Sequence, residues 1–157
     1  MTIPPRQSWC HALSALALED LQHQTAALAG ALTITDVGLP QSGLALLALR
    51  DGAFQESFNL GEVPLAQAHV SVRAADGREA HGGAVVLEDQ VELARTLAIL
   101  DAVLAGRLPG WEQVAQTVAR GAALRAQEQD ERNRILARTR VDFSVFGREQ
   151  EDDEEEE

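Results

Sequence analysis

The chain has 157 residues, 45% of them hydrophobic, and a formal net charge of −12. This length and composition are enough to bury one hydrophobic core, so we expect one domain. Eight acidic residues lie between Glu149 and Glu157, which leaves a net charge of only −4 on the rest of the chain. There is no tyrosine and little aromatic surface on which bases could stack, so the composition does not support binding to nucleic acid.

The first predicted elements are two short helices. Trp9, Leu13 and Leu16 are spaced to share one helical face, and two prolines precede them, as is common at the start of a helix. A second helical pattern covers residues 19–29. Gly30 follows it, and we expect this glycine to end the helix in a left-handed conformation. The two patterns predict an N-terminal helical hairpin.

The next segments have the pattern of strands. Residues 32–37 and 44–50 are rich in β-branched or apolar side chains, and turn residues separate them. A further strand is indicated where Phe54, Phe58 and Leu60 recur with a period of two. We therefore expect these segments to pair in one sheet.

Residues 68–87 predict a β-hairpin. Asp76 and Gly77 stand between two apolar runs, and this dipeptide is a strong signal for a two-residue turn. With the segments before it, the hairpin gives a mainly antiparallel sheet of three or four strands.

Two helices are predicted after the sheet. The first, over residues 89–106, has Asp89 and Glu92 at the spacing of a capping box. Its apolar face consists of four leucines: Leu93, Leu97, Leu100 and Leu104. We expect this face to cover the sheet.

The last predicted helix changes character along its length. Trp111, Val114 and Val118 give its first part a packing face, whereas residues 125–134 offer only Ala126 as an apolar side chain. The second part is therefore predicted to be solvated or to contact a partner. The expected class is α+β: an N-terminal helical hairpin, a three- to four-stranded sheet, two C-terminal helices and an extended C-terminal segment.

The best pair of residues for metal binding or acid–base chemistry is His69 with His81, because both lie in the predicted hairpin. A two-residue turn would place His81 opposite Val72 and His69 opposite Ala84, so the imidazoles would point to opposite faces of the sheet. We therefore expect no metal site. A small metal-dependent enzyme using His69 and His81 remains an alternative function.

Other catalytic patterns are weak. The glycines of residues 73–83 lie in a hairpin, whereas a phosphate-binding loop leads into a helix N-terminus. None of the serines lies in a nucleophile-elbow motif. We therefore assign no catalytic residue and expect no cofactor.

The single cysteine, Cys10, excludes an internal disulfide, a thiolate-held iron–sulfur cluster and a four-thiolate zinc site within this chain. The first residues lack the layout of a secretory signal, and no apolar run approaches the roughly 20 residues that span a bilayer. We expect a cytoplasmic protein that does not enter the membrane.

Five segments, read in order, resemble the PhnG family, the small subunit of the bacterial carbon–phosphorus lyase core complex. They are RQSWCHAL, FNLGEV, AHVSVRAADGREAHGGAVVLED, ELARTLAILDAVL and ARTRVDFSVFGRE. The resemblance extends from Arg6 to about Arg148, and its most specific part is the run from Arg140 to Phe143.

The resemblance implies an accessory subunit that works with PhnI, PhnH and PhnJ, together with the PhnL-type ATPase. These proteins support the transfer of an alkylphosphonate such as methylphosphonate onto the ribose of ATP. Adenine is released, and ribose 1-methylphosphonate 5-triphosphate is formed. PhnI carries the nucleosidase-like chemistry, and PhnJ cleaves the carbon–phosphorus bond.

The C-terminal apolar residues are the predicted partner-binding site. They alternate with polar residues, in the manner of an extended segment that docks in a groove or on a sheet edge. The residues of this site are Arg140, Val141, Asp142, Phe143 and Phe146.

Residues 1–148 are predicted to form one domain whose docking extension starts near residue 125, and residues 149–157 are predicted to be a disordered acidic tail. The alternatives are that the apolar residues pack on their own sheet, or that the chain is a stand-alone binding module.

Overall fold

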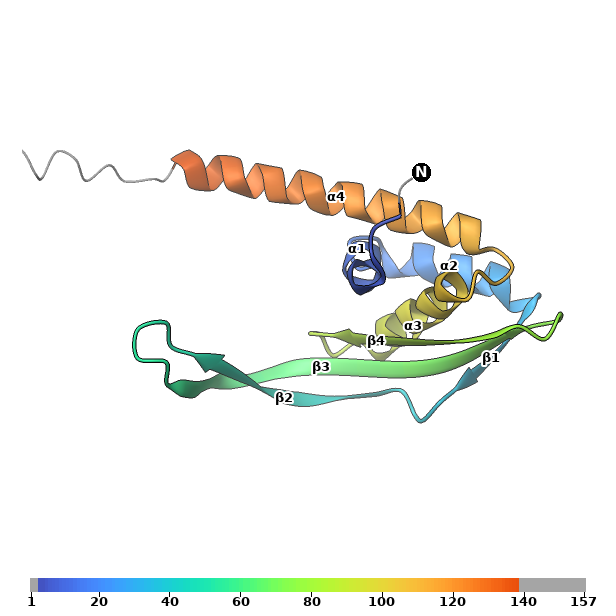
Figure 1. Ribbon diagram of the computed structural model, residues 1–157, viewed down its shortest axis with the longest axis horizontal. Coiled ribbons are helices and arrows are strands. Elements are labelled where there is room, and N and C mark those ends of the chain that lie inside the picture. The colour runs from blue at the N-terminus through green and yellow to red at the C-terminus, as the bar shows by residue number, and fades with distance from the viewer. Residues whose placement is uncertain (1–2, 139–157) are drawn as a thin grey trace, which may run out of the picture. The chain divides into compact units, whose positions relative to one another are not determined.

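The computed structural model describes residues 3–138, so the predicted partner-binding site, residues 140–146, lies outside the described residues. The chain divides into two units, Met1–Arg125 and Ala126–Glu157. The first unit is an α+β domain in which helices cover one face of a four-stranded antiparallel sheet (Figure 1). This agrees with the predicted class.

The N-terminal helices are a 3-10 turn, η1 (Arg6–Ser8), and two α-helices, α1 (Trp9–Leu13) and α2 (Leu18–Ala29). Helix α1 is shorter than the sequence pattern predicted, because Leu16 lies beyond its end. The prediction of a left-handed Gly30 is wrong: its φ is −69° and its ψ is −23°, a right-handed helical conformation. Helix α2 therefore ends without using the special freedom of glycine.

Strand β3 (Ser57–Ala74) is the central strand of the sheet. β1 (Leu32–Asp36) and β2 (Gln41–Arg50) pair with successive parts of one edge of β3, and β4 (Glu79–Val86) pairs with the other edge. All of these pairings are antiparallel.

The sequence predicted two separate strands where the structure has the single strand β3. The proline in its middle, Pro64, is opposite Leu44 of β2, and the pairing with β4 begins only at Ala66. A proline is tolerated in a strand where its missing N–H would have had no ladder partner. β3 therefore continues through Pro64 and forms a long hairpin with β2.

The β3–β4 turn is one residue longer than predicted. Gly77 donates its N–H to the carbonyl of Ala74 at 3.0 Å, and Ala74 donates its own N–H to the carbonyl of Arg78 at 2.9 Å. Gly77 has a φ of +88°, so the loop is a turn closed by a left-handed glycine, a common three-residue hairpin connection. The extra residue shifts the strand pairing, so that His69 is opposite Gly83 and His81 is opposite Ser71.

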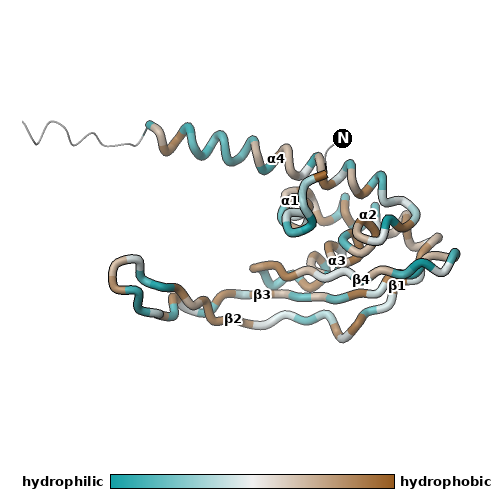
Figure 2. The backbone as a smooth tube through the Cα atoms, in the orientation of Figure 1, coloured by the Kyte–Doolittle hydropathy of each residue, from teal (hydrophilic) through white to brown (hydrophobic). Residues whose placement is uncertain are grey.

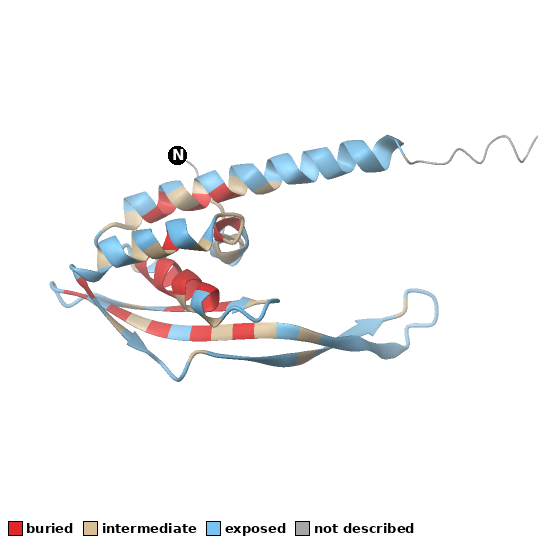
Figure 3. Ribbon diagram, turned by 180° about the vertical axis from the view of Figure 1, so that it is seen from behind, coloured by how far each residue is buried: buried red, intermediate tan, exposed pale blue. Residues whose placement is uncertain are grey.

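Helix α3 (Val91–Ala105) provides most of the core. Its four predicted leucines are all buried, and the helix packs on β3 and β4 (Figure 3). The predicted capping box is wrong, because Gln90 occupies the N-cap position and no side chain caps the helix.

The last helix is α4 (Trp111–Arg138). Val114 and Val118 are buried in its first part, as predicted, and Gly121 packs closely on the N-terminal segment. From Ala126 to Arg138 every residue is exposed. Among the described residues, no helix combines the length and apolarity that crossing a membrane requires.

Candidate functional site

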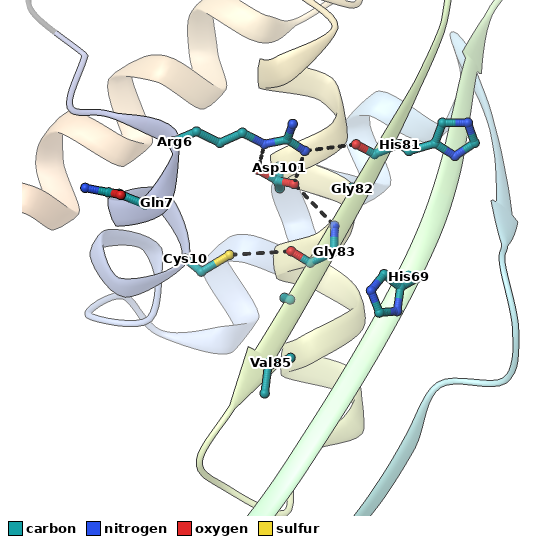
Figure 4. A pocket seen from close by; sticks show the side chains of 10 residues that line it. Arg6, Gln7, Cys10, His69, His81, Gly82, Gly83, Val85 and Asp101 are labelled. Atoms are coloured by element: carbon teal, nitrogen blue, oxygen red, sulfur yellow. Dashed lines mark hydrogen bonds and ion pairs between the residues drawn. The ribbon is translucent and has the colours of Figure 1, made fainter.

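An ion pair between Arg6 and Asp101 joins the N-terminal segment to helix α3. The Arg6 guanidinium donates from Nε to Asp101 Oδ1 at 3.0 Å and from Nη2 to Asp101 Oδ2 at 2.7 Å (Figure 4). The Asp101 side chain is only 6% exposed, whereas that of Arg6 is 55% exposed. A buried carboxylate in a bidentate pair is strongly oriented, because both of its oxygens are committed.

The same ion pair also binds the free edge of β4. Arg6 Nη2 donates to the carbonyl oxygen of His81 at 3.0 Å, and Asp101 Oδ2 accepts the N–H of Gly83 at 3.2 Å. A side-chain pair thus takes the place of a neighbouring strand at this point. Unpaired strand edges invite association with other chains, and such a covering blocks it.

Gly82 makes this arrangement possible. A Cβ atom on Gly82 would lie 2.0 Å from the carbonyl oxygen of Ala98 and 2.6 Å from the backbone nitrogen of Ala102. Only glycine therefore permits α3 to lie this close to β4. The close approach is what brings Asp101 within reach of the Gly83 N–H.

Cys10 lies beside the ion pair. Its Sγ atom is 3.9 Å from the carbonyl oxygen of Gly83. Burial, followed by the negative charge of Asp101, raises the pKa of the Cys10 thiol to about 11, although the positive charge of Arg6 opposes the shift. The thiolate is the nucleophilic form of cysteine, so this thiol is poorly suited to nucleophilic catalysis near neutral pH.

The raised pKa of Cys10 predicts that its thiol reacts slowly. With a pKa raised from 9.0 to about 11, the thiolate fraction of Cys10 at pH 8 should be about 100-fold smaller in the folded protein than in the unfolded one. We expect its reaction with a chromogenic disulfide to be slower by a similar factor than in urea. The rate should keep rising with pH up to about 11. A rate that levels off near pH 9 would contradict the raised pKa, whereas restricted access alone would leave the shape of the pH profile unchanged.

The two predicted histidines share one face of the sheet, which corrects the prediction that they point to opposite faces. Because of the longer turn, His81 lies opposite Ser71, and Ser71 is two residues from His69 on β3. Positions two apart on a strand face the same way. Both histidines are exposed, whereas the neighbours of His69 on β3, Ala68 and Val70, are buried, so the two imidazoles lie on the face opposite the core.

The surroundings of the histidines are polar. Glu79 accepts hydrogen bonds from Ser71 and Arg73, and these contacts lower the pKa of its carboxyl. Within residues 3–138, no group of three or more His, Cys, Asp or Glu side chains is arranged to hold a metal ion.

An open groove of about 720 Å³ surrounds the ion pair. Its lining residues are Arg6, Gln7, Cys10, His69, His81, Gly82, Gly83, Ala84, Val85 and Asp101. The charged groups that line it are committed to backbone atoms of β4, and the thiol is held in its protonated form. The groove therefore contains a strand edge that the ion pair already covers, and it contains no activated thiol.

A group of exposed apolar side chains lies on the hairpin of β2 and β3. Six of its apolar side chains are between 40% and 80% exposed: Leu44, Leu46, Leu49, Phe54, Phe58 and Leu60. Figure 2 shows this hairpin continuing beyond α1, α2 and α3, with apolar positions along it. Exposed apolar surface of this extent is typical of sites that bind other proteins.

Sequence reasoning identified the histidines but missed the ion pair. The available signal was Asp101 itself, an acidic residue that lies among Leu97, Ala98, Leu100 and Ala102 on an otherwise apolar helix. An acid placed among core positions requires a partner. Nothing in the sequence showed that the partner would be Arg6, 95 positions away.

Comparison with models of protein families identifies one match. The model described as "Phosphonate metabolism protein PhnG" matches residues 4–148. The chain belongs to the PhnG family. The matched range contains Arg6, Asp101, both histidines and the apolar hairpin. Membership of the family indicates a role in phosphonate metabolism. Comparison with curated proteins found no significant match.

Proposed function

We propose that this PhnG-family chain is an accessory subunit of the carbon–phosphorus lyase complex. In this role it supports the transfer of an alkylphosphonate such as methylphosphonate onto the ribose of ATP. The reaction releases adenine and gives ribose 1-methylphosphonate 5-triphosphate. Its site of action is the cytoplasm.

The uncovered apolar side chains of Phe54, Phe58 and Leu60, near the tip of the β2–β3 hairpin, are the observation that carries this proposal. Phe54 is 80% exposed and Leu60 is 63% exposed, although the domain has a well-formed core elsewhere. Burying a large apolar side chain contributes about 1.5–3 kcal/mol, so such residues favour assembly with another protein. A subunit that works by contact needs this kind of surface.

The proposed partners are PhnI, PhnH and PhnJ, with the PhnL-type ATPase acting in the same pathway. The chemistry resides in those subunits, and this chain contributes contact surfaces and no cofactor. Arg140, Val141, Asp142, Phe143 and Phe146 form a second contact, which anchors the C-terminal segment to a partner subunit.

An omission experiment tests the function. PhnI, PhnH, PhnJ and PhnL are combined with ATP and methylphosphonate, with or without this chain, and adenine is measured by chromatography. Adenine release should require the complete set and should fall to background without this chain. This chain alone should release none.

Two results would contradict the proposal. Adenine release that is unchanged when the chain is omitted would show that it has no supporting role. Release by the chain alone, abolished by His69→Ala or His81→Ala and restored by a divalent metal after chelation, would instead support the small metal-dependent enzyme. The shared face of the two histidines keeps that second function testable.

The C-terminal anchor gives a separate prediction. Replacing both Phe143 and Phe146 with alanine should weaken co-purification with the partner subunits, because each ring would contribute about 2 kcal/mol or more to the contact. The melting temperature of the isolated chain should change little. Deletion of Glu149 to Glu157 is the control, since a solvated acidic run should leave assembly nearly intact. If the double substitution destabilises the isolated chain and the folded fraction still assembles, these rings belong to its own core.

A further inference from the structure

The outer edge of β2 has unpaired backbone groups. Among the described residues, β2 pairs with β3 alone and is the terminal strand on its side of the sheet. It is ten residues long, which is at the upper end of the usual range of strand lengths. A long edge strand is a template for pairing with another strand.

The direction of the backbone groups follows from the antiparallel pairing, in which alternate residues bond to the two neighbouring strands. Gly83 gives its N–H to Asp101, so the even-numbered residues of β4 are the ones that bond to β3. His69 accepts the N–H of Val37 on the other side of β3, which agrees with this alternation. The odd-numbered residues of β3 therefore bond to β2.

The register between β2 and β3 shows which residues of β2 form hydrogen bonds with β3. Ala45 is opposite Val63 and Gly43 is opposite Leu65, so the odd-numbered residues of β2 bond to β3. The even-numbered residues, among them Leu44 and Leu46, direct their N–H and C=O groups away from the sheet.

The edge of β2 lacks the protection found at β4. The Arg6–Asp101 ion pair covers the free edge of β4, whereas β2 has no charged residue and no proline from Gln41 to Leu49. Charges, prolines and coverings are the usual means of preventing edge-to-edge association. Leu44 is 69% exposed and Leu46 is 60% exposed, so this edge is apolar as well as open.

The sequence of β2 is complementary to itself about Leu46. In an antiparallel pair of two copies with Leu46 on the two-fold axis, the two residue numbers of every pair add up to 92. Ser42 then faces Arg50, Gly43 faces Leu49, Leu44 faces Ala48 and Ala45 faces Leu47. Each pair joins a small side chain to a large one, so the two copies interdigitate, and only the central leucines meet like with like.

We infer that two copies of this chain associate through β2, by antiparallel pairing centred on Leu46, and form one continuous sheet across a two-fold axis. The strand that pairs with this edge is β2 of a second copy, because small side chains of one copy then lie opposite large side chains of the other. Isologous contacts of this kind are the commonest basis of dimers.

Electrostatics permits this association despite the net charge of −12. The paired segment contains no acid, and the basic Arg50 faces the neutral Ser42. The nearest acid on the core-facing side is Glu62, opposite Leu46 on β3. The two Glu62 residues would be three strand spacings apart, about 14 Å, which exceeds the screening length of about 8 Å at physiological salt.

Solution mass tests the association with the isolated full-length chain. At about 100 μM, where micromolar association is nearly complete, sedimentation equilibrium should give twice the chain mass of 16.9 kDa. Leu46→Lys and Leu46→Glu should each give the monomer mass, because like charges would meet on the axis. An equimolar mixture of these two variants should restore the dimer mass. Leu87→Lys, at a similarly exposed leucine off the edge, is the matched control and should remain dimeric.

Disulfide formation tests the register. Directly opposite residues that exchange hydrogen bonds have Cα atoms about 5.5 Å apart, within the range of a disulfide. Leu46→Cys should therefore form a covalent dimer on mild oxidation, whereas Leu44→Cys should not, because its two copies would be about 14 Å apart. The wild type, with only Cys10, gives the background.

The inference does not depend on the proposed function, since the isolated chain is the sample. A monomeric wild type at 100 μM would overturn it, as would Leu46→Lys remaining dimeric. Cross-linking of Leu44→Cys in preference to Leu46→Cys would overturn the register. Circular dichroism of each variant confirms that a monomer mass comes from folded protein.

Discussion

Gly82→Ala should produce a large loss of stability for a change of one methyl group. The added Cβ would lie 2.0 Å from the carbonyl oxygen of Ala98, a backbone atom that cannot move without shifting α3. Overpacking of this kind costs about 3 kcal/mol or more when the contacted atom is rigid. The free energy of unfolding, measured in urea, should fall by that amount, or the variant should fail to fold.

Gly30→Ala is the matched control for this prediction. Gly30 has right-handed helical dihedral angles, and no atom lies within 4 Å of a Cβ built on it. Alanine should therefore stabilise the protein by about 0.4–1 kcal/mol, since it restricts the unfolded chain. Destabilisation at Gly30 would show that this residue adopts the left-handed conformation that the sequence predicted. An unchanged unfolding free energy for Gly82→Ala would show that α3 does not lie against β4 as described.

Asp101→Ala should also lower the free energy of unfolding strongly. The change removes the acceptor of the Gly83 N–H and the partner of the Arg6 guanidinium. Breaking a buried ion pair by removing one member costs about 3–5 kcal/mol. Because Arg6 can turn to solvent from a side chain that is 55% exposed, we expect a value near the lower end, about 3 kcal/mol. Urea unfolding measures it.

Asp20→Ala provides the comparison for the ion pair. Asp20 meets Arg120 at 3.4 Å, and both side chains are more than half exposed. Exposed pairs contribute about 0–1 kcal/mol, so this substitution should have little effect. Equal effects of the two aspartate substitutions would mean that Asp101 does not anchor the edge of β4. Protection of the Gly83 amide against hydrogen exchange should also be lost in Asp101→Ala alone.

Local patterns in the sequence predicted the elements that depend on neighbours along the chain. The four leucines of α3 recur at helical spacing, and all four are buried. The strand regions, apart from the continuity of β3, the α+β class and the change of character along α4 also followed from periodicity and composition. These features are local, because the periodicity of apolar residues decides which face of an element can be buried.

The exact length of a turn, and the strand register that follows from it, could not be predicted from the sequence. The Asp76-Gly77 signal located the β3–β4 turn but did not give its length, since a left-handed glycine fits both two-residue and three-residue loops. That single residue decided that His69 and His81 share a face. A register shift of one residue reverses the orientation of every side chain on the strand.

The sequence by itself determined the family, the element types and the residues available for a core. Only the tertiary structure decided which distant parts of the chain meet. Arg6 pairs with Asp101, and α3 packs against the backbone of Gly82. β2 pairs with β3 alone, which leaves its other edge open. Helical and strand periodicity act over a few residues, whereas these contacts join segments that lie far apart and are selected by the packing of the whole domain. The physical reason is that a buried charge or a close backbone approach is stable only when every surrounding element is already in place.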